Sequence, residues 1–360
     1  MVHKKILILI IIAIIILLFH NCTENVIEPK FKKLKCLGFK DKFALKLVLS
    51  NQYLYACAGS DGVWQRNIRQ MNSDWKYLGL RDTSLGKFGN VGALDMDVLG
   101  EDILVAYNGS GPFIPADSTI SVWRSTNGGL NWFRSDNGIP ESIPDPYEPN
   151  TLTSLQRSPH QPNIVVGLID PAGYRSLDGG NNWTMIFGIR GVFSGGGYVR
   201  WHPFRQGEVW FFGSDALSHP YCFSMKDYGI NIKVSIDFDS LGFPSDAAVY
   251  DIAFDAANPD IIYAATSRGI IKSFDGGYTW MTDIIHLPDN GLVNRLVNHP
   301  TLGGTIYMGG GRSIYSSTNS GENVNKIAVV EIGSIQSLTF DTRENQLFIG
   351  TTEGIYVLKL

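Results

Sequence analysis

The stretch Ser273-Phe-Asp-Gly-Gly-Tyr-Thr-Trp280 contains the pattern that decides the fold. Its form is Ser-x-Asp/Asn-x-Gly-x-x-Trp. A short Asp or Asn side chain can accept hydrogen bonds from the amides of its own turn, and glycine reaches backbone angles that other residues adopt only with strain. The tryptophan buries a large surface, on the order of 150–250 Å². We therefore interpret these residues as structural.

The same pattern recurs along the chain. Two further copies are complete, and a fourth copy ends in Val324 where the others have tryptophan. The copies are Ser125, Asn127, Gly129 and Trp132; Ser176, Asp178, Gly180 and Trp183; Ser273, Asp275, Gly277 and Trp280; and Ser317, Asn319 and Gly321.

Each copy belongs to a longer repeat made of an apolar run, a turn with glycine, a second short apolar run and a closing turn. The second runs end at positions 66, 125, 176, 224, 273, 317 and 358, which is about one four-stranded blade apart in each case. In the fifth repeat the expected strands are 249–254, 261–266, 269–274 and 280–285. The chain is predicted to be all-β, a single propeller of seven four-stranded blades.

The last repeat stops after its third strand, at Leu360. The segment Phe31–Phe39 precedes the first repeat and belongs to no other blade. We expect it to supply the outer strand of the last blade, which would close the ring and remove an exposed sheet edge. The propeller then spans residues 31–360.

The motif and its spacing resemble the Asp-box (BNR-repeat) propellers over roughly residues 31–360, within the wider class of WD40/YVTN/BNR-like repeats. In that family the box lies in a peripheral turn, away from the face where ligands usually bind. The family includes sialidases, xyloglucanases, sorting-receptor ectodomains and photosystem assembly factors, so the fold does not give the function. The photosystem assembly factors are similar in size and export, and this likeness implies binding in place of catalysis.

The bulk composition describes a folded globular chain that does not bind nucleic acid. Hydrophobic residues make up 44% of the chain, charged residues 18%, and the formal net charge is -4. Cys36, Cys57 and Cys222 are interpreted as buried free thiols in strands, although a Cys36–Cys57 bond stays an alternative. Without a CxxC or a histidine partner pattern, no metal or cofactor is expected.

The N-terminus predicts export. Lys4 and Lys5 precede the apolar run Ile6–Phe19, which is short for a bilayer-spanning helix, and Cys22 follows soon after. Residues 1–22 are interpreted as a signal peptide with a lipobox-like end at a lipidated Cys22, and 23–30 as a tether. This arrangement makes the protein a cell-envelope lipoprotein, periplasmic or on the outer surface. An uncleaved N-terminal membrane anchor and simple release are the alternatives.

Two enzyme classes of the family fit poorly. Sialidases need three convergent arginines, the first of them in an Arg-Ile-Pro phrase near the first strand. Here residues 31–49 contain no arginine, and the nearest phrase, Gly138-Ile139-Pro140, has glycine in its place. Xyloglucanase-type enzymes join two propellers, and this chain holds one. No catalytic residue is therefore predicted.

Two long connections, Asn108–Thr119 and Ser135–Asn150, are expected on the face opposite the Asp-boxes, which we call the loop face. Long loops on a rigid scaffold often carry binding groups, although these could also be solvated loops without a ligand. The candidate ligand-binding residues there are Phe113, Asp117, Glu141, Asp145, Tyr147 and Glu148.

The expected inner strands carry a second group of candidates. Asp95, Asp97 and Asp251 could hold a hard cation but more often bond backbone amides, and Arg200 and His202 could contact an anionic ligand or form a structural pair. The function we expect is an exported, membrane-tethered, non-catalytic binding scaffold, monomeric, with a protein or glycan on the loop face. The alternative is a carbohydrate-active propeller, either a glycoside hydrolase such as an exo-α-sialidase or a lectin-like glycan binder.

Overall fold

The computed structural model describes residues 31–70, 72–82, 91–108, 121–140, 151–170, 172–188, 194–215, 219–244 and 247–360. Lys33–Leu360 forms one compact unit. The regular elements of the described residues are all β-strands. No helix in this part of the chain has the length and apolar character needed to cross a membrane.

The strands form seven four-stranded sheets, numbered here as blades in chain order. Blade 1 holds β2 (Lys46–Ser50), β3 (Tyr53–Cys57), β4 (Val63–Asn67) and β5 (Lys76–Gly79), and blade 2 holds β6 (Gly92–Leu99), β7 (Asp102–Asn108), β8 (Ser121–Ser125) and β9 (Phe133–Arg134). Blade 3 holds β10 (Thr151–Arg157), β11 (Val165–Asp170), β12 (Ala172–Ser176) and β13 (Thr184–Gly188), and blade 4 holds β14 (Ser194–Trp201), β15 (Val209–Asp215), β16 (Pro220–Lys226) and β17 (Asn231–Ser235). Blade 5 holds β18 (Val249–Phe254), β19 (Ile262–Thr266), β20 (Gly269–Ser273) and β21 (Met281–Ile285), and blade 6 holds β22 (Arg295–Asn298), β23 (Ile306–Gly310), β24 (Ser313–Ser317) and β25 (Asn325–Val329). Blade 7 holds β26 (Ile335–Asp341), β27 (Gln346–Thr351), β28 (Gly354–Lys359) and, as its outer strand, β1 (Leu34–Cys36).

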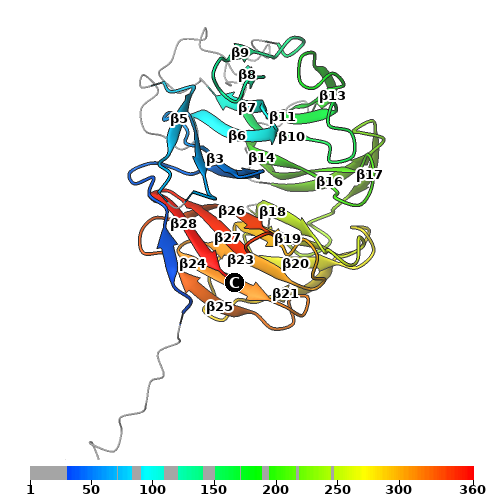
Figure 1. Ribbon diagram of the computed structural model, residues 1–360. Helices are drawn as coiled ribbons and strands as arrows, with labels where there is room; N and C mark the ends of the chain where they lie inside the picture. The colour runs from blue at the N-terminus through cyan, green and yellow to red at the C-terminus, as the bar shows by residue number, and fades with distance from the viewer. Residues whose placement is uncertain are drawn as a thin grey trace, which may run out of the picture. The chain divides into compact units, whose positions relative to one another are not determined.

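The first strands of the blades form a closed ring. Each of β2, β6, β10, β14, β18, β22 and β26 contacts the next, and β26 contacts β2. The strand β1 pairs antiparallel with β28, with Leu34 opposite Leu358 and Cys36 opposite Tyr356, as Figure 1 shows in blue and red. The seven-bladed propeller and its closure by an N-terminal strand are therefore confirmed.

The closing strand is shorter than the segment expected to form it. It ends at Cys36 because Gly38 and Phe39 have φ values of 89° and 69°, which turn the backbone out of the extended conformation. The Leu37 N–H still donates to Ile355 O at 2.7 Å, and the Ile355 N–H donates to Gly38 O at 3.1 Å, so the pairing continues by two bonds. Phe39 itself is buried in the core.

The hydrophobic core lies between the blades. In one cluster Trp210 and Phe212 of blade 4 pack with Ile252, Phe254 and Ile271 of blade 5. Because each blade buries one apolar face against its neighbour, no blade has a complete core of its own. The ring must therefore be complete to bury these faces.

The Asp-boxes have one repeated geometry. In all four copies the serine hydroxyl accepts the N–H of the box glycine at 2.8–2.9 Å. The same hydroxyl donates to the Asp or Asn oxygen at 2.7–3.0 Å. At Gly277 φ is +92°, and a Cβ atom would lie 2.4 Å from the ring of Trp210, so the position requires glycine.

The box tryptophans join neighbouring blades. Trp183 is buried, and its Nε1 donates to Ser135 O, at the end of blade 2, at 2.8 Å. Trp132 is half-buried and donates to Leu78 O in blade 1 at 2.9 Å. The boxes thus act in the packing of blade on blade.

The cysteines follow the expectation in part. Cys57 and Cys222 are free and buried, in β3 and β16, and burial raises the pKa of both thiols. Cys36 is free but exposed, so its expected burial is wrong. The reason is its place in the outermost strand, whose burial decreases from Leu34 to the exposed Cys36.

Candidate functional site

The inner strands leave one row of backbone N–H groups without a partner strand, and polar side chains of the preceding blade fill this need. Asp95 Oδ2 accepts the Leu155 N–H at 3.2 Å, and Asp251 Oδ2 accepts the Leu296 N–H at 2.9 Å. Ser337 accepts the Leu47 N–H at 3.0 Å in the same way. An open strand edge would otherwise be exposed or unsatisfied, so these side chains join the blades at the axis.

The charged members of this set are also paired. Lys46 Nζ lies 2.8 Å from Asp95 Oδ1, and Arg200 bonds to Asp251. Asp97 accepts from the backbone N–H and the Nε of Arg157, and Arg157 Nη2 lies 3.0 Å from Asp102 Oδ2. Burial raises the pKa of Asp97, while Arg157 acts in the opposite direction. Three or more His, Cys, Asp or Glu side chains placed to hold a metal ion are not found among the described residues.

His202 occupies a turn directly after β14. It is buried, and its Nδ1 accepts the N–H groups of Phe204 and Arg205, each at 3.1 Å. Nδ1 is therefore the unprotonated nitrogen, and Nε2 donates to Pro259 O at 2.9 Å. Burial lowers the pKa of His202 to about 4.

The same capping arrangement recurs after other inner strands. The capping acceptor is Ser158 after β10, Asp255 after β18, His299 after β22 and Asp341 at the end of β26. His202 therefore has the environment of a structural turn residue. Arg200, which is one-third exposed, faces Asp251, and its predicted role toward a ligand stays a prediction.

The six predicted loop-face residues, Phe113, Asp117, Glu141, Asp145, Tyr147 and Glu148, lie outside the described residues. The described strands that border these connections are β7, which ends at Asn108, and β10, which begins at Thr151. Their predicted role in binding stays a prediction.

A hollow of about 470 Å³ opens at the other end of β7, in the size range of small-molecule sites. We call it the Tyr53 hollow. It lies between the β2–β3 turn of blade 1, the β6–β7 turn and Asp-box of blade 2, and Arg343 of blade 7. Its lining residues are Ser50, Asn51, Gln52, Tyr53, Tyr55, Gln65, Lys76, Gly100, Glu101, Asn127, Gly128, Leu130 and Arg343.

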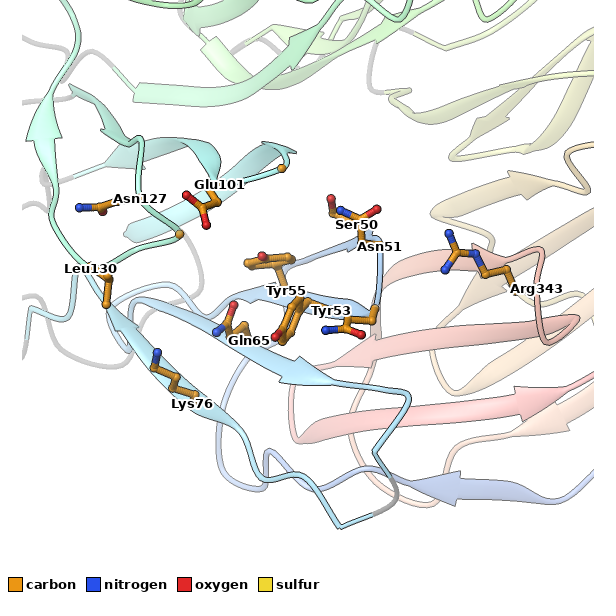
Figure 2. Close-up of a pocket in the computed structure, with 13 residues that line it drawn as sticks. Ser50, Asn51, Tyr53, Tyr55, Gln65, Lys76, Glu101, Asn127, Leu130 and Arg343 are labelled. Atoms are coloured by element: carbon orange, nitrogen blue, oxygen red, sulfur yellow. The ribbon is translucent and has the colours of Figure 1, made fainter.

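Figure 2 shows how these groups lie. Tyr53 and Tyr55 stand at the centre, with ring centroids 6.3 Å apart. Glu101 lies on one side of them, Gln65 and Lys76 on another, and Arg343 across from the Asp-box wall. Within the described part of the chain, the side chains of Glu101, Lys76 and Gln65, which line the hollow, form no hydrogen bond or ion pair.

The tyrosines differ in exposure. Tyr55 is 4% exposed, and burial raises its pKa, with smaller effects from Tyr53 and Glu101. Tyr53 is half-buried. The sequence analysis missed this hollow because Tyr53 and Tyr55 lie in an apolar run that reads as core. The signal available was their spacing of two, which places both rings on one face of a strand.

Comparisons with known proteins agree on the fold. No family model matches the chain. A xyloglucanase of Paenibacillus sp is 26% identical over 244 residues, which is 62% of this chain and 23% of that protein. The chain thus spans less than a quarter of the length of the curated relative it matches.

Solved structures match over most of the chain. YCF48 bound to D1 peptide has a TM-score of 0.61 at 12% identity, covering 92% of this chain and 98% of that one. YCF48 from Cyanidioschyzon merolae has a TM-score of 0.62 at 12% identity, covering 91% and 98%. The GH74 enzyme of Niastella koreensis has a TM-score of 0.67 at 14% identity, covering 90% of this chain and 53% of that one. At identities this low, the structural likeness shows a shared fold alone.

Proposed function

We propose that this propeller is an exported, membrane-tethered binding scaffold that holds a protein segment on its loop face without catalysing a reaction. The main support for this proposal is that the carboxylates near the axis are already engaged in ion pairs and hydrogen bonds. Near the axis Asp95, Asp97 and Asp251 are each held by a cation and by backbone N–H groups. Groups engaged in this way join blades and are not poised for acid–base work.

The Tyr53 hollow supports the same conclusion. Glycoside hydrolases commonly use a pair of carboxyl groups on either side of the scissile bond. The residues that line the hollow include one carboxylate, Glu101. A binding role fits this lining better than hydrolysis.

A protein partner is favoured by the likeness to YCF48, a propeller of nearly equal extent whose structure was solved with a D1 peptide. The long connections on the loop face would supply the contact residues, with Tyr147 and Glu148 among them. Aromatic and polar side chains on loops above a rigid scaffold are a common form of binding surface.

The second candidate is a carbohydrate-active propeller. It is supported by the 26% identity to a xyloglucanase over 62% of the chain. This chain matches about half of the GH74 enzyme chain, so the remainder of that enzyme has no counterpart in the match. Turnover of any member of a panel of aryl glycosides by the purified full chain would favour this candidate over the scaffold.

The partner site is tested by in-cell cross-linking. A full chain with a photoreactive residue at position 113 should give a cross-linked protein adduct, and Tyr147→Ala with Glu148→Gln should reduce its yield several-fold. We expect an unchanged melting temperature, because both positions are predicted to lie in a surface loop, where substitutions usually alter stability by less than about 0.5 kcal/mol. Tyr278→Ala is the matched control, because Tyr278 is 63% exposed in an Asp-box turn. An adduct that Tyr278→Ala removes and the loop substitutions leave intact would overturn the loop-face site.

The tether is tested separately. Cells grown with an alkyne fatty acid should label the wild-type protein and leave Cys22→Ser unlabelled. A wild type without label would rule out a lipidated Cys22, and fractionation would then separate an uncleaved anchor from release.

A further inference from the structure

Among the described residues, the Tyr53 hollow differs from the axis in being lined by several polar side chains, those of Glu101, Lys76 and Gln65, that have no hydrogen-bond or ion-pair partner there. Glu101 accepts, Lys76 donates, and the Gln65 amide does both. Arg343 adds a second cation at the rim. A ligand for this space must therefore present donors and acceptors together.

The hollow fits an anion poorly. The Gly128 N–H, which could serve a phosphate, already donates to Glu101 O at 2.9 Å. The lining also carries both signs of charge, the Glu101 carboxylate beside the Lys76 and Arg343 cations, so it offers no purely cationic surface for an anion.

The hollow also lacks the features that would bind a peptide through an inserted side chain. Leu130 is the one aliphatic residue of the lining, and it lies at the surface, 71% exposed. Inserted peptide anchors need a dry apolar pocket, and strand addition needs a free backbone edge. The backbone of β3 pairs on both sides, with β2 and β4.

The centre of the hollow is aromatic. Tyr53 is half-buried, and its ring is tilted 60° against that of Tyr55. Tyr55 is almost wholly covered, which fixes the pair in place. A tyrosine combines an apolar ring with a polar tip, which suits a ligand with C–H groups on one face and hydroxyls at its edge.

The walls are held by their own hydrogen bonds. Asn127 Oδ1 accepts from Ser125 Oγ and from the Asn131 N–H, both at 3.0 Å, so the Asp-box fixes this side of the hollow. The bond from Gly128 N–H to Glu101 O ties that wall to the β6–β7 turn. The Asp-box wall and the backbone of the β6–β7 turn are thus preformed, which lowers the cost of binding to the ordering of the Glu101, Lys76 and Gln65 side chains.

From this geometry we infer that the Tyr53 hollow binds a neutral carbohydrate unit of mono- or disaccharide size. Pyranose hydroxyls would bond to Glu101, Lys76 and Gln65, and an apolar ring face would lie on Tyr53 (Figure 2). The hollow lies at the opposite end of β7 from Asn108, where the predicted loop face begins. It is thus a second site, independent of the protein partner proposed above.

The test is a calorimetric titration of the full chain in a sugar-free detergent, because glycoside detergents would compete. The probes are cellobiose, lactose and maltose, with an N-acetylated, amidated Gly-Tyr-Gly peptide and inorganic phosphate as comparison ligands. At least one disaccharide should bind with a Kd on the order of 1 mM. Glu101→Ala and Lys76→Met should each weaken it by about tenfold or more.

The matched control is Glu353→Ala, which removes an exposed carboxylate from the β27–β28 turn, and it should leave the Kd unchanged. All variants should share the wild-type melting temperature, which separates lost binding from lost folding. No heat with any of the three sugars would overturn the inference, as would sugar binding that Glu101→Ala and Lys76→Met leave intact. Binding of the peptide or phosphate alone would also overturn it. The loop-face cross-link should not respond to Glu101→Ala, so the two proposals fail independently.

Discussion

At the scale of single residues, short polar side chains determine the turns of this propeller. The Asp-box serines and the capping side chains after the inner strands both accept backbone N–H groups that have no strand partner. Asp178 shows the effect on charge. Burial acts to raise its pKa, yet bonds from Asn182, Ser176 and Asn181 hold that pKa at about 2.

His202 makes stability depend on pH. Its pKa is about 4 in the folded protein and about 6.5 when unfolded, so between these values the unfolded chain binds a proton that the folded chain does not. The contribution is fully present above pH 6.5 and is lost as the pH falls toward 4, by up to about 3 kcal/mol. His202→Asn keeps an acceptor for the turn but does not titrate, so its unfolding free energy, measured with urea, should depend less on pH across this window.

His299→Asn is the matched control, since His299 caps the equivalent turn of blade 6 from a less buried position, where burial lowers its pKa. It should reduce the pH dependence by less than His202→Asn does. Equal pH dependence in wild type and His202→Asn would contradict the assignment.

Residue roles were predictable where residue type repeats. Ser176, Asp178 and Gly180 stand in a pattern found four times, so their structural role could be predicted. The caps Ser158, His202, Asp255, His299 and Asp341 share a position but not a chemistry. The sequence alone therefore left His202 open to interpretation as a ligand-binding residue.

At the scale of strands, side chains of the neighbouring blade accept the backbone N–H groups at the free edges of the inner strands. Asp251 is 3% exposed and accepts from Ile252 N–H, Leu296 N–H and Arg200. Ser337 serves the Leu47 N–H in the same way without a charge. Adjacent blades are thus joined by side chains where no strand pairing exists.

Removing such a side chain should lower the unfolding free energy more when it leaves more buried hydrogen-bond donors without an acceptor. Asp251→Ala leaves buried N–H groups and Arg200 without an acceptor, and we expect a loss of about 3 kcal/mol of unfolding free energy. Ser337→Ala should cost about 1–2 kcal/mol. Asp251→Asn, which retains one acceptor oxygen, should lie between wild type and Asp251→Ala. Urea unfolding measures these free energies. If Asp251→Ala is as stable as wild type, or if Asp251→Asn does not lie between the two, Asp251 does not join the blades.

Strand positions were predictable because apolar runs alternate with glycine turns. In blade 5 the expected inner strand 249–254 coincides with β18, and the other three differ from β19, β20 and β21 by one residue at an end. Blade 4 lacks an Asp-box yet forms four strands, as the spacing through Ser224 indicated. The length of β1 was not predictable, because it depends on the positive φ of Gly38 and Phe39.

At the scale of the molecule, the ring depends on one junction between the two ends of the described chain. Near the end of that junction the Leu37 N–H donates to Ile355 O, and the Ile355 N–H donates to Gly38 O. The Leu37 carbonyl also accepts from Trp75 Nε1 at 2.9 Å, so the segment before β5 of blade 1 is bonded to the same residue.

Leu37→Pro should open this junction. Proline removes the N–H and leaves Ile355 O without its partner, which should lower the unfolding free energy by about 1–3 kcal/mol beyond the loss in Leu37→Ala. Leu37→Ala is the control because it removes the same side chain and keeps the N–H. Thermal and urea unfolding should each show one transition at a lower midpoint for proline. Equal midpoints for the two variants would show that the bond does not hold the ring.

The Tyr53 hollow was beyond the reach of sequence reasoning for a physical reason. Its walls come from strands and turns of blades 1 and 2 and from Arg343 of blade 7, which is distant along the chain and meets them only in the closed ring. A repeat pattern predicts the blades but not which turn residues converge, since Glu101 and Gln65 belong to no motif.

The pairing of β1 with β28 also determines the order in which the propeller can fold. On the ribosome, the part of the propeller that emerges first must stay unpaired until its partner, from the far end of the polypeptide, has been synthesised. Contacts so remote in sequence form slowly, and unpaired strands left waiting are prone to associate with other chains. The pairing of β1 with β28 is therefore the folding step at which a newly synthesised chain is most prone to misassembly.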